Sequence, residues 1–418
     1  MNKKEGMGMN VYIFSDAHFF QVPTGEIFTD LVYDREFFAR YLTTFEQINV
    51  VGRLTAVKSV DSKMLRVDSE KIHVLPLPNF YGAIGAVKYV IPLIKKIHAY
   101  LGRSDLVILR GPGTIPFFVG LIYFFMNHNG KVLGMEVIGD PWTLFGKGVN
   151  KYKFSFIARY LETFGFKFLA KKSNGVSYVT NFYLQSMYPC QATIAKRNTL
   201  EYFTASYSSI ILPDDSISTP RVYKDTKCFK IVHVAANYTN YAKGHVTVIR
   251  AVKELVDHGY EDVCVTFIGD GPLRREFEKL AEKIGVKKYI TFIGKLANAK
   301  EVKKKISNSD MMVFPTASEG LPRVLLEAMS EGLPCLSSPV CGIPEILKDK
   351  YLFDHQDYKG FAREIAHLLN SPDELTQMSR ENIKTAESYI ESKLKVKRDM
   401  FYESLRDLTI FKCENIKA

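Results

Sequence analysis

Two glutamates eight positions apart, Glu319 and Glu327, have the setting in this chain that best fits ligand chemistry. Residues 310–346 read in order as a short apolar strand, a loop that carries Glu319, and a helix that carries Glu327. The free amides and the dipole at the start of a helix favour an anionic ligand there without a metal ion. The segment therefore predicts a site for a phosphate-bearing donor.

An apolar stripe supports this helix. Leu321, Val324, Leu325, Ala328 and Met329 fall at positions i, i+3, i+4, i+7 and i+8, the spacing of a core-facing helix surface. Glu327 lies off the stripe, so we expect it to face solvent or a cleft. A simpler interpretation remains open on these residues alone. Glu319 would then only support the helix dipole, and Glu327 would be a solvated surface residue.

The residues that follow extend the pattern. Gly332-Leu333-Pro334 ends the helix, and Gly342-Ile343-Pro344-Glu345 opens another. With Glu319 and Glu327, this run resembles the retaining GT-B glycosyltransferases of family 4, which carry a Glu-x7-Glu motif, a Gly-x-Pro turn and a Gly-Gly-x-Pro-Glu segment. Cys341 stands where the first glycine of that pair is usual. The resemblance implies that Glu319 contacts the donor sugar and that Glu327 binds the ribose hydroxyls.

The resemblance extends backwards to Lys243-Gly244, which follows a strand at 230–236 and a polar loop. It implies that Lys243 neutralises the donor diphosphate, for which a flexible ammonium is a suitable partner. The alternative is a solvated loop lysine. The family usually has an arginine six residues earlier, where this chain has Asn237. An amide can hydrogen-bond phosphate, but it supplies no charge.

Two further segments resemble donor-side parts of the family. Gly269-Asp270-Gly271-Pro272 looks like its Gly-x-Gly-Pro turn, although a tight turn before a helix explains these residues equally well. The strand at 289–296 resembles the segment beside the nucleobase, and an ordinary buried parallel strand is the alternative. The predicted donor-binding residues are Asn237, Gly244, Lys295, Leu296, Gly320, Leu321, Pro322 and Glu327, with Glu319 and Lys243 in catalytic roles. Amides near Gly320, Leu321 and Pro322 would help to stabilise the leaving diphosphate.

The elements that must position these residues alternate between short apolar strands and helical stretches from Met9 to about Phe353. This alternation is typical of parallel sheets covered by helices. At 418 residues the chain exceeds what one core usually supports, and the polar, turn-rich segment 213–220 is the predicted joint. The strands predicted in the first half are Asn10 to Ser15, Ile48 to Arg53, His73 to Leu77, Asp105 to Arg110, Lys131 to Ile138 and Val176 to Val179.

The predicted fold class is therefore α/β, in the GT-B arrangement of two Rossmann-like domains that face each other across a cleft. Residues 1–215 would form the acceptor-side domain, 216–385 the nucleotide-sugar-binding domain, and 386–418 a helix that packs back on the first domain. In open sheets of this kind, ligands bind beyond the carboxyl ends of the strands.

The acceptor side is less well marked. The family usually has a Gly-Gly loop after the first strand, and here Pro23-Thr24-Gly25-Glu26 offers one glycine, so Gly25 is the candidate for a close backbone approach. Near the later strand ends, Arg110 and Asp140 are candidates for acceptor-side or sugar-side roles. Turn chemistry at strand ends is the alternative for both segments.

Several kinds of chemistry are not expected. No Asp-x-Asp occurs in the chain, which argues against a metal clamp, and we expect neither a metal nor a cofactor. The six cysteines lack metal-site spacing and read as small core residues in a reducing compartment. We recognise no secretory signal and no membrane span, which favours a cytoplasmic location.

The net charge of +11 is concentrated in the first half of the chain. Between Lys95 and Lys172, twelve Lys or Arg face four acids, an excess of +8. Within this range, residues 151–172 mix bulky aromatics with cations, a composition that suits a helix lying on an anionic membrane surface. A core helix with a solvated cationic face is the alternative. No nucleic-acid-binding motif accompanies the charge.

Together these features predict a glycosyltransferase that moves a sugar from a nucleotide diphosphate-sugar to a hydroxyl of a saccharide acceptor. The acceptor is expected to be lipid-linked, in the synthesis of a cell-surface polysaccharide. Retention of anomeric configuration is implied by the resemblance only. Two other classes stay open: a nucleotide-sugar epimerase of the same architecture, and a non-catalytic nucleotide-sugar-binding module of an assembly complex.

Overall fold

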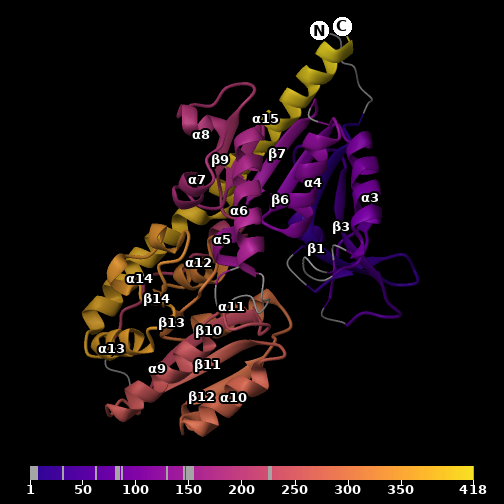
Figure 1. Cartoon of the computed structure of the whole chain (residues 1–418). Helices are drawn as coiled ribbons and strands as arrows, with labels where there is room; N and C mark the ends of the chain where they lie inside the picture. The colour runs from indigo at the N-terminus through magenta and orange to yellow at the C-terminus, as the bar shows by residue number, and fades with distance from the viewer. Residues whose placement is uncertain are drawn as a thin grey trace.

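The computed structural model describes residues 8–30, 33–61, 64–80, 85, 88–128, 130–144, 146, 155–224 and 228–417. It contains two separate sheets, each flanked by helices (Figure 1). The first sheet is built from residues before 207 and the second from residues after 228. Among the described residues, no helix is both long and apolar enough to cross a membrane.

The N-terminal sheet is parallel apart from two short strands, β2, which pairs antiparallel with β1, and β4, which pairs antiparallel with β2. Its parallel strands run in the spatial order β5-β3-β1-β6-β7-β8-β9. Their bounds are β1 (Val11–Gln21), β3 (Ile48–Ala56), β5 (Ile72–Leu77), β6 (Leu106–Gly111), β7 (Val132–Val137), β8 (Gly175–Tyr178) and β9 (Phe203–Ser206). The antiparallel strands are β2 (Ile27–Thr29) and β4 (Leu65–Arg66).

All six strands predicted in this half are confirmed. Strand β1 continues to Gln21, beyond the predicted end at Ser15, because it pairs with β3 and β2 after its pairing with β6 has ended. The helices of this half are α1 (Arg35–Ala39), α3 (Val90–Arg103), α4 (Thr114–Phe125), α5 (Pro141–Leu144), α6 (Ser155–Lys172), α7 (Tyr183–Met187) and α8 (Gln191–Ala195).

The second sheet has five parallel strands in the order β12-β11-β10-β13-β14. They are β10 (Phe229–Asn237), β11 (Val263–Asp270), β12 (Ile290–Gly294), β13 (Met311–Phe314) and β14 (Cys335–Ser337). Strands β13 and β14 are buried along their whole length, as expected where helices cover both faces of a parallel sheet. The helices are α9 (His245–Asp257), α10 (Arg274–Lys283), α11 (Ala299–Ser307), α12 (Arg323–Ser330), α13 (Tyr358–Leu369) and α14 (Pro372–Ala386).

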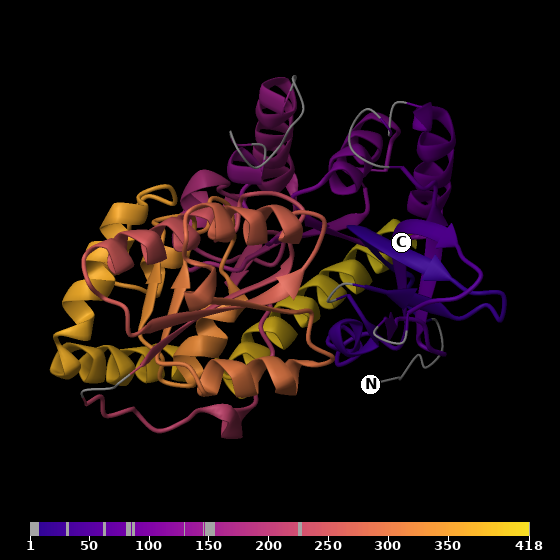
Figure 2. The same cartoon turned by 90° about the horizontal axis from the view of Figure 1, so that it is seen from below.

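The last helix, α15 (Glu391–Lys417), joins the two halves. Figure 2 shows it crossing from the C-terminal half to the N-terminal half, where it contacts β6, β7, β8 and β9. Leu405 lies so close to the sheet that a Cβ on Gly134 would be 2.8 Å from its side chain. The chain therefore returns to its first sheet after completing the second, and the fold is the predicted α/β class with parallel sheets.

Candidate donor site

Lys243 and Glu319 come from loops at the carboxyl ends of two neighbouring strands. Strand β10 precedes the loop with Lys243, and β13 precedes the loop with Glu319. Because β10 and β13 pair in parallel, these loops emerge side by side. The Lys243 ammonium forms an ion pair with the Glu319 carboxylate and lies 3.4 Å from the carbonyl oxygen of Ser318. The structure thus brings the two predicted catalytic side chains together, and both remain partly exposed.

Gly244 is required by the contact between these loops. Its φ is +78°, in the region that favours glycine, and a Cβ would overlap the carbonyl oxygen of Pro315. The two loops are further joined where Ala317 donates its amide to the carbonyl of Ala242 at 2.7 Å. Gly244 also precedes α9, so the loop with Lys243 passes directly into a helix.

Helix α12 begins at Arg323, just after the residues Gly320, Leu321 and Pro322 near which amide donors are expected. Pro322 is the N-cap and has no amide hydrogen, so any amide donors near it belong to its neighbours. Leu325 already donates to the carbonyl of Pro322. The first amides without an acceptor inside the helix are those of Arg323 and Val324.

Glu327 lies half-buried on α12. Burial raises the pKa of its carboxyl, and the nearby Arg323 charge opposes the shift. No described residue hydrogen-bonds this carboxylate, in keeping with a group that is available to a ligand. Its role toward ribose stays a prediction.

The remaining predicted donor residues lie around this centre. Asn237 is exposed at the end of β10, in register with Asp270 of β11. Lys295 is exposed after β12, and its ammonium lies 3.5 Å from the carbonyl of Asp30 in the N-terminal half. Leu296 is half-buried. A pocket of about 700 Å³ adjoins the Lys243 loop, but it opens between α9 and α10 and is lined by Ala242, Gly244 and Ala317 rather than by Lys243 or Glu319.

The loop with Glu319 also touches the N-terminal half. Gly320 packs on Ile138 and Gly139 beyond the end of β7, and a Cβ there would overlap the carbonyl of Ile138. The hydroxyls of Thr143 and Ser318 lie 3.0 Å apart. The loop before α12 therefore contacts α5 and the end of β7, and Figure 1 shows these elements between the two sheets.

Arg110 is buried within the N-terminal half, and its acceptor-side role stays a prediction. It forms a buried ion pair with Glu136 of β7, and the two side chains are only 5% and 2% exposed. Glu136 also accepts hydrogen bonds from Tyr41 at 2.7 Å and from Tyr402 of α15 at 2.7 Å. Burial raises the pKa of Glu136, but the Arg110 charge and these hydrogen bonds outweigh it and hold the pKa below its usual value.

The acceptor-side role of Asp140 likewise stays a prediction. Its side chain is fully buried. The carboxylate accepts hydrogen bonds from the Tyr183 hydroxyl at 3.0 Å, from the Tyr188 hydroxyl and from the Trp142 amide at 2.8 Å. The Asp140 carboxylate is therefore hydrogen-bonded by groups of the protein itself.

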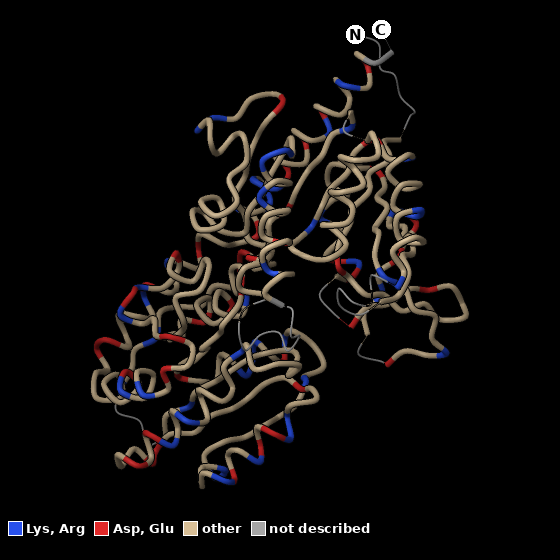
Figure 3. The backbone as a smooth tube through the Cα atoms, viewed as in Figure 1, with Lys and Arg blue, Asp and Glu red and all other residues tan. Residues whose placement is uncertain are grey.

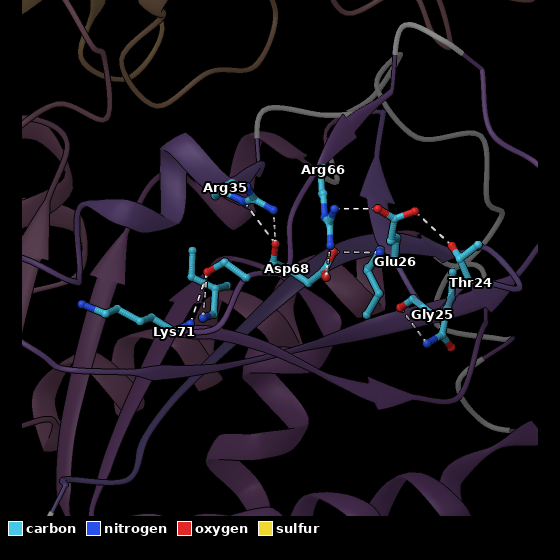
Figure 4. Close-up of polar contacts among 11 residues, drawn as sticks. Thr24, Gly25, Glu26, Arg35, Arg66, Asp68 and Lys71 are labelled. Carbon is cyan, nitrogen blue, oxygen red and sulfur yellow. Dashed lines mark hydrogen bonds and ion pairs between the residues drawn. The ribbon is translucent and has the colours of Figure 1, made fainter.

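Gly25 occupies the turn between β1 and β2. Its φ is +91°, its amide donates to the carbonyl of Val22, and a Cβ on it would meet no other described residue within 4 Å. Figure 4 shows the polar contacts beside it, where Glu26 accepts from Thr24 at 3.0 Å and pairs with Arg66. The hairpin turn accounts for this glycine without a ligand.

Two carboxyl groups near the carboxyl end of β6 are not among the residues that the sequence predicts for a site. Asp16 accepts the amide of Thr114 at 2.6 Å at the start of α4 and lies 3.7 Å from Arg53. Glu162 of α6 is near it, and burial together with the Asp16 charge raises the pKa of Glu162 to about 8. Carboxylates inside apolar segments were the available signal. Among the described residues, no group of three or more His, Cys, Asp or Glu is placed to hold a metal ion.

Comparison with known proteins agrees with this geometry. Residues 222–385 match the family model described as glycosyl transferases group 1. Protein CapJ of Staphylococcus aureus is 25% identical over 365 residues, which is 86% of this chain and 87% of CapJ. The lipopolysaccharide glucosyltransferase WaaG of Escherichia coli is 36% identical over 75 residues, which is 18% of this chain and 19% of WaaG.

Solved structures extend the likeness to the whole chain. Sucrose-phosphate synthase from Thermosynechococcus elongatus aligns with a TM-score of 0.68 at 12% identity, covering 96% of this chain and 99% of the synthase. HepE of Anabaena, solved in complex with UDP, aligns with a TM-score of 0.60 at 12% identity and covers 98% of this chain and 100% of HepE. At such identities the alignments show the fold. With the family match over residues 222–385 and the relatives above, they support a GT-B glycosyltransferase.

Proposed function

We propose that this protein transfers a sugar from a nucleotide diphosphate-sugar to a hydroxyl of a saccharide acceptor, with retention of configuration. The observation that carries the proposal is the Lys243–Glu319 pair at the carboxyl ends of β10 and β13, next to the start of α12. The UDP complex of HepE and the sugar transfer named for WaaG support the same ligand class. Retention rests on the family resemblance of the motif around Glu319.

In the proposed mechanism, charge accumulates on the leaving diphosphate as the bond to the sugar breaks. Lys243 and the first amides of α12 stabilise that charge, because fixed positive groups act most strongly where charge develops. Glu319 contacts the sugar and Glu327 binds the ribose hydroxyls. We assign to Arg323, at the first turn of α12, the positive charge toward the diphosphate that Asn237 does not supply.

We assign the binding of donor and acceptor to different sheets. We assign residues 216–385 to donor binding and residues 1–215 to the acceptor, with residues 386–418 joining the two. The contacts of α15 with β6 to β9 support this division. We also propose that the donor lies between the halves, because ligands of open α/β sheets bind beyond the carboxyl ends of the strands.

A screen of nucleotide sugars tests the function. Ligand binding raises thermal stability by mass action, so a donor is recognised first by the rise in unfolding temperature and then by its turnover. We expect sugar transfer to an added acceptor. Isomerisation of the free donor without an acceptor would identify an epimerase instead, and binding without any turnover would identify a non-catalytic module.

Removal of divalent metal should leave activity largely intact. The proposed site meets the diphosphate charge with Lys243 and a helix start rather than with a bound ion. Initial rates are measured before and after dialysis against EDTA, with Mg²⁺ or Mn²⁺ added back as a control. A strict requirement for either ion, with activity restored on its return, would exclude this mechanism.

The proposed acceptor is lipid-linked, because the N-terminal half carries an exposed apolar surface beside cations. This surface, called the apolar patch below, lies on the packed helices α4 and α6. Its largest exposed fractions are 82% at Phe125 and 79% at Phe164. Its other members are Leu121, Met126, Phe156, Ile157, Tyr160, Leu161 and Phe168. Exposed apolar side chains concentrated on two packed helices are typical of an interaction site.

Lysines border the apolar patch at the end of α6. Lys167, Lys171 and Lys172 are exposed there. Figure 3 marks all Lys and Arg positions of the backbone in blue. Phe166, expected among the surface aromatics, is instead buried against the sheet, because it lies on the opposite side of α6. Lys151, Lys153 and Phe154 lie outside the described residues. We propose a peripheral position on the inner face of the cytoplasmic membrane, in polysaccharide biosynthesis.

Binding to anionic liposomes should fall as salt rises. Each lysine near the surface contributes roughly 1 kcal/mol, and this attraction is screened within a Debye length of about 8 Å at physiological ionic strength. Co-sedimentation is compared for the wild type and a variant with Gln at positions 167, 171 and 172. Lys253→Gln on α9, which removes one positive charge in the other half, serves as a control for position. No sedimentation of wild-type protein at low salt would favour a soluble acceptor.

A further inference from the structure

One carboxylate of the C-terminal half holds three consecutive backbone amides of the N-terminal half. Glu345 accepts from the amide of Asn181 at 2.6 Å through one oxygen, and from Phe182 at 3.0 Å and Tyr183 at 2.8 Å through the other. These amides begin helix α7, whose N-cap Phe182 has no side-chain hydrogen bond of its own. The acceptor for the start of α7 is therefore supplied from more than 160 residues away.

The turn that carries Glu345 is packed directly on the loop that carries Glu319. Gly342 donates its amide to the carbonyl of Gly320 at 2.9 Å. A Cβ on Gly342 would lie 2.6 Å from the Thr180 methyl and 3.1 Å from the Gly320 oxygen. No side chain fits at Gly342, which therefore lies between the Thr180 methyl on one side and the Gly320 backbone on the other.

Gly320 in turn rests on the N-terminal half at Ile138, and Ser318 bonds Thr143 at 3.0 Å. The loop of Glu319 is thus held from two sides, by the end of β7 directly and by α7 through Glu345. Tyr183 also links α7 to this end of β7 directly, because its hydroxyl donates to Asp140 at 3.0 Å.

We propose that Glu345 is a positioning residue, which fixes the loop 318–320 against the N-terminal sheet and so sets the distance between donor and acceptor. The proposal rests on the proposed function, since it assigns the purpose of the contact to sugar transfer. Donor binding itself uses groups of the C-terminal half and does not need the contact. Loosening it should therefore impair transfer to the acceptor more than donor binding or the slow hydrolysis of the donor by water.

Amide hydrogen exchange tests the contact without any substrate. Glu345→Ala should raise exchange about tenfold in residues 179–185, because charge-assisted hydrogen bonds to three amides are lost. It should also raise exchange in residues 316–322. Glu345→Gln keeps one acceptor oxygen and should have a smaller effect on both segments. Glu387→Gln, an exposed carboxylate near α15, is the control and should change neither segment. Faster exchange at 179–185 alone would reduce Glu345 to a cap of α7 and overturn the proposal.

Kinetics tests the purpose of the contact. We expect the kcat for transfer to fall about tenfold in Glu345→Ala, while the Kd of the nucleotide-sugar changes less than twofold and the ratio of transfer to hydrolysis falls. A weaker donor Kd with unchanged kcat would overturn the proposal. If the wild type turns over no nucleotide-sugar, the proposed function fails, and the exchange experiment still decides whether Glu345 couples the two segments.

Discussion

Replacing Lys243 by Ala, or Glu319 by Gln, is expected to reduce sugar transfer by about 100-fold or more. Loss of a fixed charge at a position where transition-state charge develops typically has an effect of this size. The measurement is the initial rate of transfer at saturating donor for each variant. Near wild-type rates in both variants would contradict the assignment of this site.

The ion pair between these residues adds a second expectation. Lys243 and Glu319 contact each other directly, so their effects should not be independent. A Lys243→Ala/Glu319→Gln double variant should lose less activity than the product of the two single losses. Lys253→Ala, which removes an exposed lysine of an intrahelical pair on α9, is the matched control and should retain activity. Unfolding temperatures of all variants separate lost chemistry from lost structure.

The arrangement of the candidate donor residues could be predicted from the sequence because its parts are local. The strand, loop and helix of residues 310–330 follow one another directly, and β10 delivers Lys243 in the same way. Parallel pairing of β10 and β13 then brings the two loops together. The carboxyl ends of neighbouring parallel strands lie at one edge of the sheet, and this rule is sufficient to predict that the two loops are close.

Cys341 illustrates a departure that the structure explains. It stands where related sequences usually have glycine, and its φ is +50°, in the left-handed region. Residues other than glycine adopt this region at a cost. Cys341 therefore adopts a conformation that a glycine would take without strain. Its next glycine, Gly342, is the one whose missing side chain the contact with Thr180 requires.

The acceptor side could not be predicted, because its polar residues are satisfied by distant partners. Arg110 meets Glu136, which also binds Tyr402 of α15, 266 residues further along the chain. Asp140 meets Tyr183 and Tyr188. Spacing along the sequence carries no information about such contacts. An arginine and an aspartate at strand ends thus looked available for a ligand although both serve the packing of the N-terminal half.

Glu136→Gln or Arg110→Met is expected to destabilise the N-terminal half by about 3–5 kcal/mol. Breaking a buried ion pair from one side leaves the other charge without compensation in a low-dielectric interior. The pair lies beneath α15, so breaking it should weaken the packing of this helix on the N-terminal sheet. Urea unfolding is followed by the fluorescence of Trp142, the single tryptophan of the chain, which reports on this half.

The pH dependence of this effect has a defined sign. The pKa of Glu136 is lower in the folded protein than its usual value, so its contribution to stability is present above the unfolded pKa of about 4.3 and is lost as the pH falls through the folded pKa. The stability gap between wild type and Glu136→Gln should therefore be full near pH 7 and shrink below pH 4.

The exposed pair of Arg66 and Glu26 is the matched control. Both side chains are about two-fifths exposed, at 43% and 39%, and exposed pairs typically contribute no more than about 1 kcal/mol. Arg66→Met should therefore change stability little. The double variant Arg110→Met/Glu136→Gln should be less destabilised than the sum of its single changes, because it removes both charges together. An Arg110→Met protein that is as stable as wild type yet inactive toward acceptor would contradict the structural role of the pair and return Arg110 to the acceptor site.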